Sequence, residues 1–387
     1  MSQFSVVFLG SEEYQIPVLF SSARAWVERE LAPLEIPVCD ELSQVASEQV
    51  LLIGAACPEV RTEQYQKLME THLAVGADLT VLSGRGSERG INRGSEGEIV
   101  SLFGGSGSAA LPVVCARTEV VRGRDMTDLL HAVNELLGEE RSAETVTIDH
   151  VVAVTNPAAA FQAQKRLCKR INYAHIAAGV QIFDPENVYI AADAVIGAGT
   201  VILPGTIIRG GCTVGCGCTV GPNTILEQAA VGDRTSVNSS QIYESRVGSD
   251  ATVGPFAYIR PGCTVGDHTR IGDFVELKKS SIGNGTKVSH LTYIGDAKVG
   301  ERVNFGCGTV IVNYDGYKKY QTVIGDDCFI GCNTNLVSPV ELGDRVFTAA
   351  GTTVTENVPD GALTIARARQ TNLEGWNDKR REKMGKK

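Results

Sequence analysis

The chain has neither a long apolar run nor an excess of positive charge. Its 387 residues include 36 Lys and Arg against 45 Asp and Glu, for a net charge of −9 and a pI near 5.3. This balance argues against a general binder of nucleic acid or of an acidic membrane surface. The apolar run Val50 to Ala56 is far too short to cross a bilayer, so we expect no membrane insertion.

A six-residue pattern begins near Val195 and continues, with breaks, to about Leu342. Each unit starts with a branched aliphatic residue, usually followed by Gly and later by a small residue; examples are Ile196-Gly-Ala-Gly-Thr-Val, Val220-Gly-Pro-Asn-Thr-Ile and Val265-Gly-Asp-His-Thr-Arg. One unit forms a strand too short to bury its aliphatic side chain alone, so the units must stack. The pattern predicts a parallel β-helix with a core ladder of Ile and Val.

Eleven cysteines are present, and no N-terminal stretch has the pattern of a secretory signal. Free thiols persist in a reducing compartment, so we expect a cytoplasmic protein. Cys212, Cys216 and Cys218 cluster as zinc ligands do. Because Cys212 and Cys218 are six residues apart, however, the repeat already accounts for both as small corner residues, and we expect no metal there.

Residues 1–155 do not follow the six-residue pattern. Apolar segments such as Gln49–Ile53 and Asp78–Leu82 alternate with helical ones such as Glu63–Val75 and Met126–Leu137, which predicts an α/β domain.

Three further regions are expected after that domain. A linking helix should occupy 156–179, with Asn156 as its N-cap and Pro157 at its first position. The β-helix should then occupy 180–358, and a polar tail should cover 359–387.

The spacing of the repeat places outer side chains of successive coils next to one another. Three units make a coil of about 18 residues, so equivalent positions lie roughly 4.8 Å apart. Arg260 and Lys278 are one coil apart and should stack on an outer edge, with Tyr258 and Glu276 stacked beside them.

The following coil is one residue shorter, which shifts the register. It places Tyr293 next to Glu276 and His290 next to Asp273, and one coil later Cys307 lies next to His290. Cations, a carboxylate, tyrosines and an imidazole are therefore expected on one part of the surface.

Two stacked cations on an acidic protein favour an anionic ligand, because a phosphate can bridge both. The alternative is a pair of solvated surface charges. His290, one of only six histidines, is either a corner residue bonded to a neighbouring coil or a general base. An enzyme that acylates an amine needs such a base to take the proton as nitrogen attacks.

A long break in the repeat extends over Gly308–Val323. It contains the turn sequence Asn-Tyr-Asp-Gly and the cations Lys318 and Lys319. Such an insertion either has no function or forms one wall of a groove between neighbouring subunits.

At these residues the sequence resembles a known family, the bifunctional N-acetylglucosamine-1-phosphate uridylyltransferase and glucosamine-1-phosphate N-acetyltransferase of bacteria. The resemblance covers about 180–387, the acetyltransferase half. Its motifs are Arg260-Pro-Gly, Phe274-Val-Glu-Leu-Lys-Lys279, His290-Leu-Thr-Tyr-Ile-Gly-Asp296, Asn313-Tyr-Asp-Gly316, Ile324-Gly-Asp-Asp, Ala349-Ala-Gly-Thr-Thr-Val354 and Gln370-Thr-Asn-Leu-Glu-Gly-Trp376.

The resemblance implies a homotrimer of left-handed β-helices with active sites at subunit boundaries. It implies a transferase that moves acetyl from acetyl-CoA, the co-substrate, to the amine of glucosamine-1-phosphate. This is a step in UDP-N-acetylglucosamine biosynthesis for peptidoglycan and the cell wall, and it needs no metal.

The resemblance also implies roles for individual residues. His290 would be the base, and Glu276 would support it. The residues implied to bind the acceptor are Arg260 and Lys278, for the sugar phosphate, and Tyr293 and Asn304, for the sugar. Those implied to contact acetyl-CoA are Cys307 through nearby backbone, Asn313, Tyr314, Lys319, Cys332, Ala350 and Arg367. The family usually has Ala and Ser at the positions of Cys307 and Cys332.

The N-terminal domain departs from the family's uridylyltransferase half. Where the family has a Gly-rich, cationic phosphate loop, this chain has Glu12 and Glu13, which is the wrong charge. The family's magnesium-binding Asp falls at Ala55 or Ala56, and a second ligand, an Asn, at Thr155. We expect a degenerate nucleotidyltransferase-like domain without uridylyltransferase activity, the one reaction that would need magnesium.

Four alternatives remain. The enzyme could be bifunctional after all, or a hexapeptide acyltransferase for another amino-sugar phosphate. A metal-dependent β-helix enzyme of the carbonic anhydrase type would need three converging histidines, and only His268 and His290 lie in the repeat. A non-catalytic scaffold would have no evident use for stacked Arg260, Glu276 and Lys278.

Overall fold

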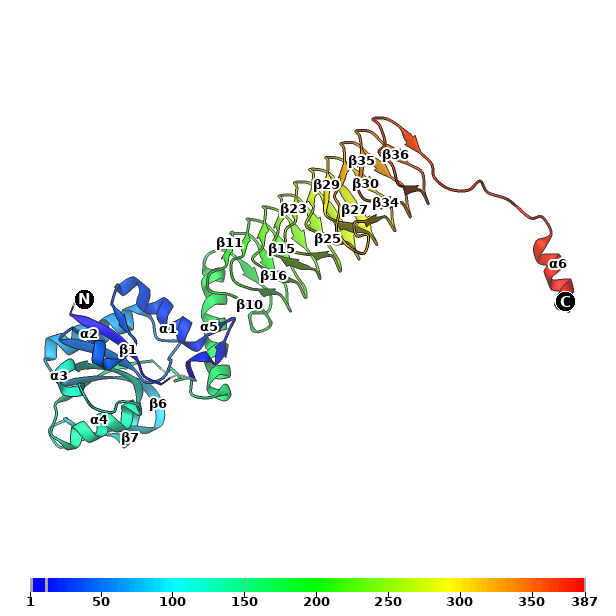
Figure 1. Cartoon of the computed structure of the whole chain (residues 1–387). Coiled ribbons are helices and arrows are strands. Elements are labelled where there is room, and N and C mark those ends of the chain that lie inside the picture. Colours follow the sequence, from blue (N-terminus) through cyan, green and yellow to red (C-terminus); the bar gives the residue numbers. More distant parts are fainter. Residues whose placement is uncertain (1–2, 11–12, 150, 386–387) are drawn as a thin grey trace. The chain divides into compact units, whose positions relative to one another are not determined.

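The structure is a computed structural model that describes residues 3–10, 13–149 and 151–385 (Figure 1). The chain forms two compact units, residues 1–174 and 175–387. Helix α5 (Pro157–Ala177) occupies the position of the expected linking helix, and the boundary between the units falls within it. The side-chain oxygen of Asn156 accepts a hydrogen bond from the backbone of Ala159 (3.0 Å), as an N-cap does.

The first unit is built on one six-stranded sheet with the order β4-β1-β5-β7-β6-β8. Strands β1, β4 and β5 are parallel, β7 is antiparallel to both β5 and β6, and β8 is parallel to β6. The strands are β1 (Phe4–Phe8), β4 (Val38–Cys39), β5 (Gln49–Ile53), β6 (Leu79–Arg93), β7 (Ile99–Arg117) and β8 (Ala143–Ile148), with a separate hairpin of β2 (Pro17–Val18) and β3 (Ser21–Ser22).

Helices cover both faces of this sheet. Residues of α4 share a buried cluster with Leu52, Val81 and Val114 on one face. Successive strand residues point to opposite faces, and Thr80, next to Val81, contacts His72 of α2 on the other face. The predicted α/β class is confirmed. The helices are α1 (Ala23–Leu31), α2 (Thr62–Val75), α3 (Thr118–Val121) and α4 (Leu129–Gly138), with 3-10 turns η1 (Glu13–Gln15), η2 (Ala32–Leu34) and η3 (Leu42–Gln44).

The second unit is the predicted parallel β-helix, formed by three sheets of ten, nine and eleven strands (Figure 1). The ten-stranded sheet contains β10 (Tyr189–Ile190), β13 (Ile207–Ile208), β16 (Ile225–Glu227), β19 (Gln241–Tyr243), β22 (Tyr258–Ile259), β25 (Glu276–Lys278), β28 (Tyr293–Gly295), β31 (Val310–Val312), β34 (Asn335–Val337) and β37 (Thr353–Val354). The nine-stranded sheet contains β11 (Val195–Ile196), β14 (Thr213–Val214), β17 (Ala230–Val231), β20 (Arg246–Val247), β23 (Thr264–Val265), β26 (Ser281–Ile282), β29 (Ala297–Val299), β32 (Thr322–Ile324) and β35 (Val340–Leu342). The eleven-stranded sheet contains β9 (Gln181–Ile182), β12 (Val201–Ile202), β15 (Thr219–Val220), β18 (Ser236–Val237), β21 (Thr252–Val253), β24 (Arg270–Asp273), β27 (Lys287–His290), β30 (Asn304–Phe305), β33 (Phe329–Ile330), β36 (Phe347–Thr348) and β38 (Leu363–Thr364).

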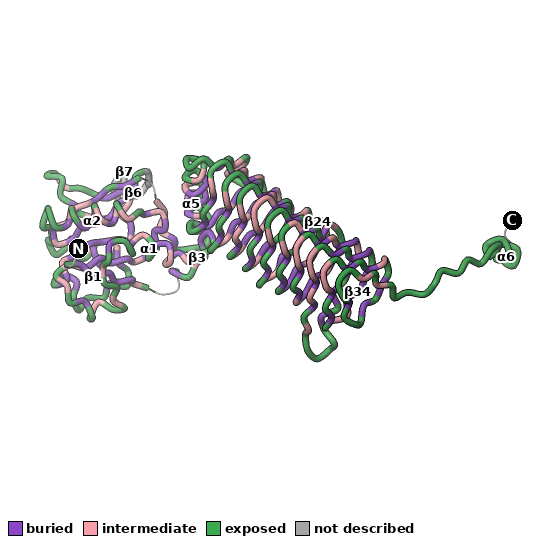
Figure 2. The backbone as a smooth tube through the Cα atoms, turned by 90° about the horizontal axis from the view of Figure 1, so that it is seen from above, coloured by how far each residue is buried: buried purple, intermediate pink, exposed green. Residues whose placement is uncertain are grey.

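Buried residues recur along the coils (Figure 2), and the aliphatic side chains among them form a ladder. Ile259 pairs with Leu277 and Leu277 with Ile294 on successive coils, and all three are fully buried. Small polar residues fill the corners: the Thr286 hydroxyl donates to the Gly300 carbonyl (2.9 Å) and accepts from the Val303 backbone (3.0 Å). This arrangement buries the corners while satisfying their backbone polar groups.

Cys212 and Cys218 are buried and lie in corners, as their spacing predicts, while Cys216 is exposed. The η4 turn (Pro185–Asn187) lies near the start of the unit, and an exposed helix, α6 (Trp376–Lys383), lies near its end. Within the described residues, no helix is both long and apolar enough to span a membrane.

The first unit contains a buried histidine whose protonation opposes folding. His72 is 2 % exposed; its Nε2 lies 3.0 Å from Gln49 Oε1, and its Nδ1 lies 2.9 Å from Thr80 Oγ1. A neutral ring satisfies both contacts by donating to the amide oxygen and accepting from the hydroxyl. Burial, with the charge of Arg117, lowers the pKa of His72 to about 4, while Asp78 opposes this shift.

We expect the first unit to lose stability as the pH falls from about 6.5 to 4. In that window the unfolded chain binds a proton at His72 and the folded unit does not, so the free energy of unfolding falls by about 3 kcal/mol in all. Urea unfolding followed by fluorescence of the buried Trp26 measures this slope. The control is His72→Gln, and an unchanged slope in that variant would contradict the assignment.

Candidate functional site

The predicted stacking of Arg260 and Lys278 is present on the ten-stranded sheet. Tyr258 pairs with Glu276, and Glu276 pairs with Tyr293 on the next coil. The backbone N–H of Arg260 donates to the Leu277 carbonyl (2.9 Å), which sets Arg260 beside Lys278. The register deduced from the spacing is therefore confirmed for three successive coils.

Each of the two cations has a carboxylate partner. Arg260 Nη1 lies 2.8 Å from Glu276 Oε1, and Lys278 Nζ lies 3.7 Å from Asp296 Oδ2. The hydrogen bond to Glu276 raises the pKa of Arg260. Lys278 is only 9 % exposed, so its ammonium group is held in place rather than freely solvated.

A third cation, Lys319, reaches this cluster from the insertion. Tyr314 and Lys319 form an antiparallel bridge, and the Asp315 carboxylate accepts hydrogen bonds from the backbone of Tyr317 and Lys318 (both 2.8 Å), which closes the turn. The close contact with Lys278, and its charge, lower the pKa of Lys319. The structure thus places Lys319 beside the residue expected to hold the sugar phosphate.

Asp296 is a member of the cluster that the sequence interpretation missed. Its Oδ2 atom accepts from the Asn313 side chain (2.5 Å) and also faces Lys278. It thereby links the buried Asn313 at the base of the insertion to the β-helix surface. Asp296 is the last residue of the His290-to-Asp296 motif. Its place in that motif is the sequence feature that could have identified it as a member of the cluster.

His290 lies in a column of residues along one corner of the β-helix. Asp273 and His290 pair on adjacent coils. Cys307, Cys332 and Ala350 each lie two residues after a ladder position of the following coils, which continues the column in register. The expectation that Cys307 lies next to His290 agrees with this register, and three positions implied to contact acetyl-CoA follow the imidazole in one line.

The imidazole contacts Asp273 instead of Glu276, which corrects the expected support of His290. Nδ1 of His290 lies 2.6 Å from Asp273 Oδ1, whereas Glu276 bonds Arg260. The reason is the corner between these residues: Asp273 ends β24 in the sheet that contains His290, and Glu276 begins β25 in the next sheet. The hydrogen bond to His290 lowers the pKa of Asp273.

The other expected residues are more dispersed. Tyr293 is half-buried beside Glu276, and half-buried Asn304 pairs with Lys287 on the sheet of His290. Tyr314 and Arg367 are exposed. The structure thus places the residues expected to bind phosphate in one cluster. His290 and the column that follows it form a second group.

An exposed apolar ridge follows the His290 corner. Phe274 directly follows Asp273, and Leu291 directly follows His290; with Phe256 of the preceding coil they are 57 %, 56 % and 60 % exposed. The Phe256 and Phe274 rings stack with centroids 5.5 Å apart. We call Phe256, Phe274 and Leu291 the apolar ridge.

The expected nucleotide positions of the first unit carry no phosphate-binding chemistry. Ala55 and Ala56, after β5, are buried apolar residues, and Thr155 is exposed. Glu12 lies outside the described residues, and of the Glu13 position only the backbone in η1 is described.

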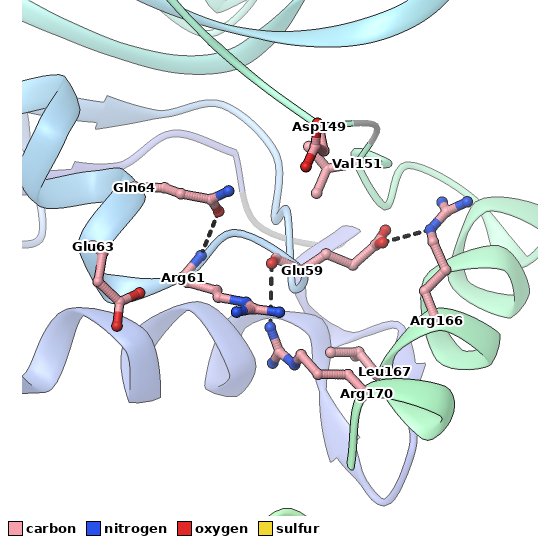
Figure 3. Close-up of a pocket in the computed structure, with 9 residues that line it drawn as sticks. All are labelled: Glu59, Arg61, Glu63, Gln64, Asp149, Val151, Arg166, Leu167 and Arg170. Carbon is pink, nitrogen blue, oxygen red and sulfur yellow. Dashed lines mark hydrogen bonds and ion pairs between the residues drawn. The ribbon is translucent and has the colours of Figure 1, made fainter. Parts of the chain in front are cut away.

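A cavity of about 410 Å³ lies in the first unit near the ends of β5 and β8 (Figure 3). Two of the three arginines that line it are bonded to the protein: Arg166 Nε lies 2.5 Å from Glu59 Oε2, and Arg170 donates to the Glu59 carbonyl (3.3 Å) and to Glu30 (3.3 Å). The Glu30 and Glu59 carboxylates offset the charge of these two guanidinium groups, whereas Arg61 also lines the cavity and Nη2 of Arg166 is buried without a hydrogen-bond partner in the described part of the chain.

Comparison with known proteins supports the assignment of the β-helix. The family model described as bacterial transferase hexapeptide (six repeats) matches residues 244–279 and 321–356. The chain is 52 % identical over 259 residues to the bifunctional protein GlmU of Clostridium perfringens, and 51 % identical over 255 residues to that of Clostridium acetobutylicum. These matches cover 67 % and 66 % of this chain and 56 % of each relative. The chain therefore spans little more than half the length of these relatives, and the resemblance to their family is confirmed.

Solved structures match less closely. The Arabidopsis UDP-N-acetylglucosamine acyltransferase has a TM-score of 0.40 and 19 % identity, covering 50 % of this chain and 75 % of that one. A CMP:2-keto-3-deoxy-manno-octonic acid synthetase has a TM-score of 0.34 and 9 % identity, covering 44 % of this chain and 100 % of that one.

We expect Lys278→Met to raise the pKa of Lys319 towards its ordinary value. The substitution removes the neighbouring ammonium group that disfavours a second positive charge. Reductive ¹³C-methylation of lysines, followed by an NMR pH titration, measures the change. Lys318→Met is the matched control, because Lys318 lies over the Tyr320 ring instead; an unmoved Lys319 titration in Lys278→Met would contradict the contact.

Proposed function

We propose that this chain, a relative of the bifunctional GlmU proteins that carries bacterial transferase hexapeptide repeats, is an acetyl-CoA-dependent N-acetyltransferase. Its acceptor is the amine of glucosamine-1-phosphate, and its product serves UDP-N-acetylglucosamine biosynthesis. The single observation that carries the proposal is the pairing of a cationic cluster with an oriented imidazole on the same coils.

The cationic cluster suits a sugar phosphate. Arg260, Lys278 and Lys319 bring three positive groups together on a protein of net charge −9. A phosphate dianion relieves the repulsion between such cations and accepts a hydrogen bond from each. Tyr293, beside Glu276 on the same sheet, and Asn304 are left to contact the sugar ring.

His290 supplies the proton acceptor for acyl transfer. As the amine nitrogen attacks the thioester carbonyl, a C–N bond forms and the C–S bond breaks. One amine proton passes to the imidazole and then to the departing thiolate, which leaves an amide and a free thiol. A base positioned for such a step typically contributes a factor of 10²–10⁴.

Acetyl-CoA is assigned to the residues that follow His290 along the corner and to the insertion. Cys307, Cys332 and Ala350 continue the column, and Arg367 lies against Gly351 beside it. Asn313 and Tyr314 belong to the insertion, whereas Lys319, which the resemblance also assigns to acetyl-CoA, lies against Lys278 and is assigned to the phosphate cluster instead. Small side chains at the three column positions leave the corner open to a long, thin co-substrate.

A homotrimer accounts for the apolar ridge. Phe256, Phe274 and Leu291 expose stacked apolar surface one residue away from the Asp273–His290 pair. A second copy of the chain would cover this surface and wall the site at the same time. All eleven cysteines are free, which suits the reducing conditions of a cytoplasmic location.

The test of the activity is thiol release from acetyl-CoA in the presence of phosphorylated amino sugars. Glucosamine-1-phosphate is expected to be the best acceptor, and glucosamine without phosphate a poor one, because it lacks the group that binds the cationic cluster. Equal rates with both would contradict the role of that cluster.

We expect His290→Ala to lower kcat by roughly 10²–10⁴-fold with a smaller change in KM. The reason is that the base acts mainly when the amine proton leaves. Steady-state thiol release measures both constants. An unchanged rate at neutral pH would leave His290 with a structural role alone.

Arg260→Ala should affect binding rather than chemistry. We expect about a tenfold rise in KM for glucosamine-1-phosphate, since a charge-assisted contact to the phosphate is lost. The KM for acetyl-CoA serves as the internal control. A rise confined to acetyl-CoA would mean that the phosphate site has been placed on the wrong cations.

The first unit is proposed to lack uridylyltransferase activity, against the alternative of a bifunctional enzyme. Buried Ala55 and Ala56 replace the carboxylate that would hold magnesium, and nucleotidyl transfer relies on that charge. We therefore expect no magnesium-dependent pyrophosphate release from UTP and N-acetylglucosamine-1-phosphate. Release above a no-enzyme control would restore the bifunctional alternative.

A further inference from the structure

The side chain of His290, the proposed base, makes a short contact with Asp273. Nδ1 of His290 and Oδ1 of Asp273 are 2.6 Å apart. The two residues end neighbouring strands, β24 and β27, and the Leu291 backbone donates to the Asp273 carbonyl (2.9 Å). Pairing of the two backbones therefore fixes the Cα positions from which both side chains extend.

This contact determines which ring nitrogen is free. An ionised carboxylate only accepts hydrogen bonds, so Nδ1 must carry the proton that is shared with Asp273. In the neutral imidazole, the lone pair then lies on Nε2. The hydrogen bond to His290, and then the charge of Arg270, keep the pKa of Asp273 low, so its carboxylate is ionised at neutral pH.

Glu276 is not available for the same task. Its carboxylate bonds Arg260 at 2.8 Å, and it belongs to the sheet on the other side of the corner. If Glu276 turned towards His290 instead, Arg260 of the proposed phosphate site would lose its carboxylate partner. The two carboxylates therefore have separate partners.

We propose that Asp273 is the positioning residue for His290: its carboxylate holds the proton on Nδ1 and presents Nε2 to the acceptor amine. The proposal deepens the proposed acetyltransferase function and rests on it. During transfer, the amine proton moves to Nε2 while the C–N bond forms and the C–S bond breaks. Asp273 stays ionised throughout and stabilises the imidazolium until the thiolate takes that proton.

The strands that pack against the Asp273–His290 pair carry few other charged or titratable groups. Arg270 lies on the strand of Asp273, and Lys287 lies on the strand of His290 and pairs with Arg270. Cys307 follows on the next coil, in register with His290. Two cations and a thiol cannot stabilise an imidazolium, so that task falls to Asp273.

The test compares Asp273→Asn with the wild-type enzyme. The amide can donate to Nδ1 and so move the ring proton to Nε2, which blocks the base. We expect kcat to fall by roughly 10- to 100-fold, less than for a fully buried dyad, with KM for both substrates nearly unchanged. A fall in kcat with both KM values unchanged is the readout that separates positioning of the base from loss of the fold.

Asp250→Asn is the matched control. Asp250 also bonds a cationic side chain on a neighbouring coil, Arg234 at 2.7 Å, but it lies away from the cluster and the column. The control is expected to keep the wild-type kcat and KM values. Thermal unfolding of both variants checks that they are folded.

NMR of the wild-type enzyme keeps the proposal testable even if Asp273→Asn does not fold. A ¹⁵N-histidine spectrum is expected to show the neutral His290 ring protonated at Nδ1. Protonation at Nε2 would overturn the proposal, as would wild-type kinetics for Asp273→Asn. If His290→Ala retained full activity, the proposed function would fail instead, so the two failures are distinguishable.

Discussion

Burial of the aliphatic ladder is the constraint on which the β-helix depends. Its strands are two to four residues long and could not persist alone. Stacking puts Ile259, Leu277 and Ile294 in line and out of water, while strand N–H groups donate to carbonyls on the next coil, as Arg260 does to Leu277. Because the ladder has one register, every outer side chain also acquires fixed neighbours, and the chemistry of the surface follows from the core.

The surface around the proposed site shows which neighbours this register gives to the charged side chains. Cations on adjacent coils would repel each other, yet Arg260 and Lys278 each meet a carboxylate, from Glu276 and Asp296. A net positive charge arises only where the insertion adds Lys319. One corner away, the same register aligns Asp273, His290 and the small residues after them. The proposed anion site and the proposed proton acceptor thus lie on different sheets of the same β-helix.

In the first unit, by contrast, the packing of the core does not determine the chemistry of the surface. Its mixed sheet remains packed by helices on both faces. At the ends of its strands, however, Ala55 and Ala56 are part of the core, and two arginines of the nearby cavity, Arg166 and Arg170, are paired with Glu59 and Glu30. A packed core needs apolar volume and satisfied polar groups but no particular catalytic charges, so this fold by itself does not specify an activity.

The sequence by itself determined the architecture of the second unit and much of its register. A period of six residues, with one short coil, was enough to place Arg260 beside Lys278 and His290 beside Asp273, because backbone pairing along a β-helix follows chain spacing. The spacing thus indicated Asp273, whereas the resemblance implied Glu276 as the support of His290; a corner between the two carboxylates sends them to different sheets, and the structure bears out the spacing. The sequence interpretation missed the contacts of Lys319 and Asp296. The insertion has no period, so only the folded chain decided where its side chains lie.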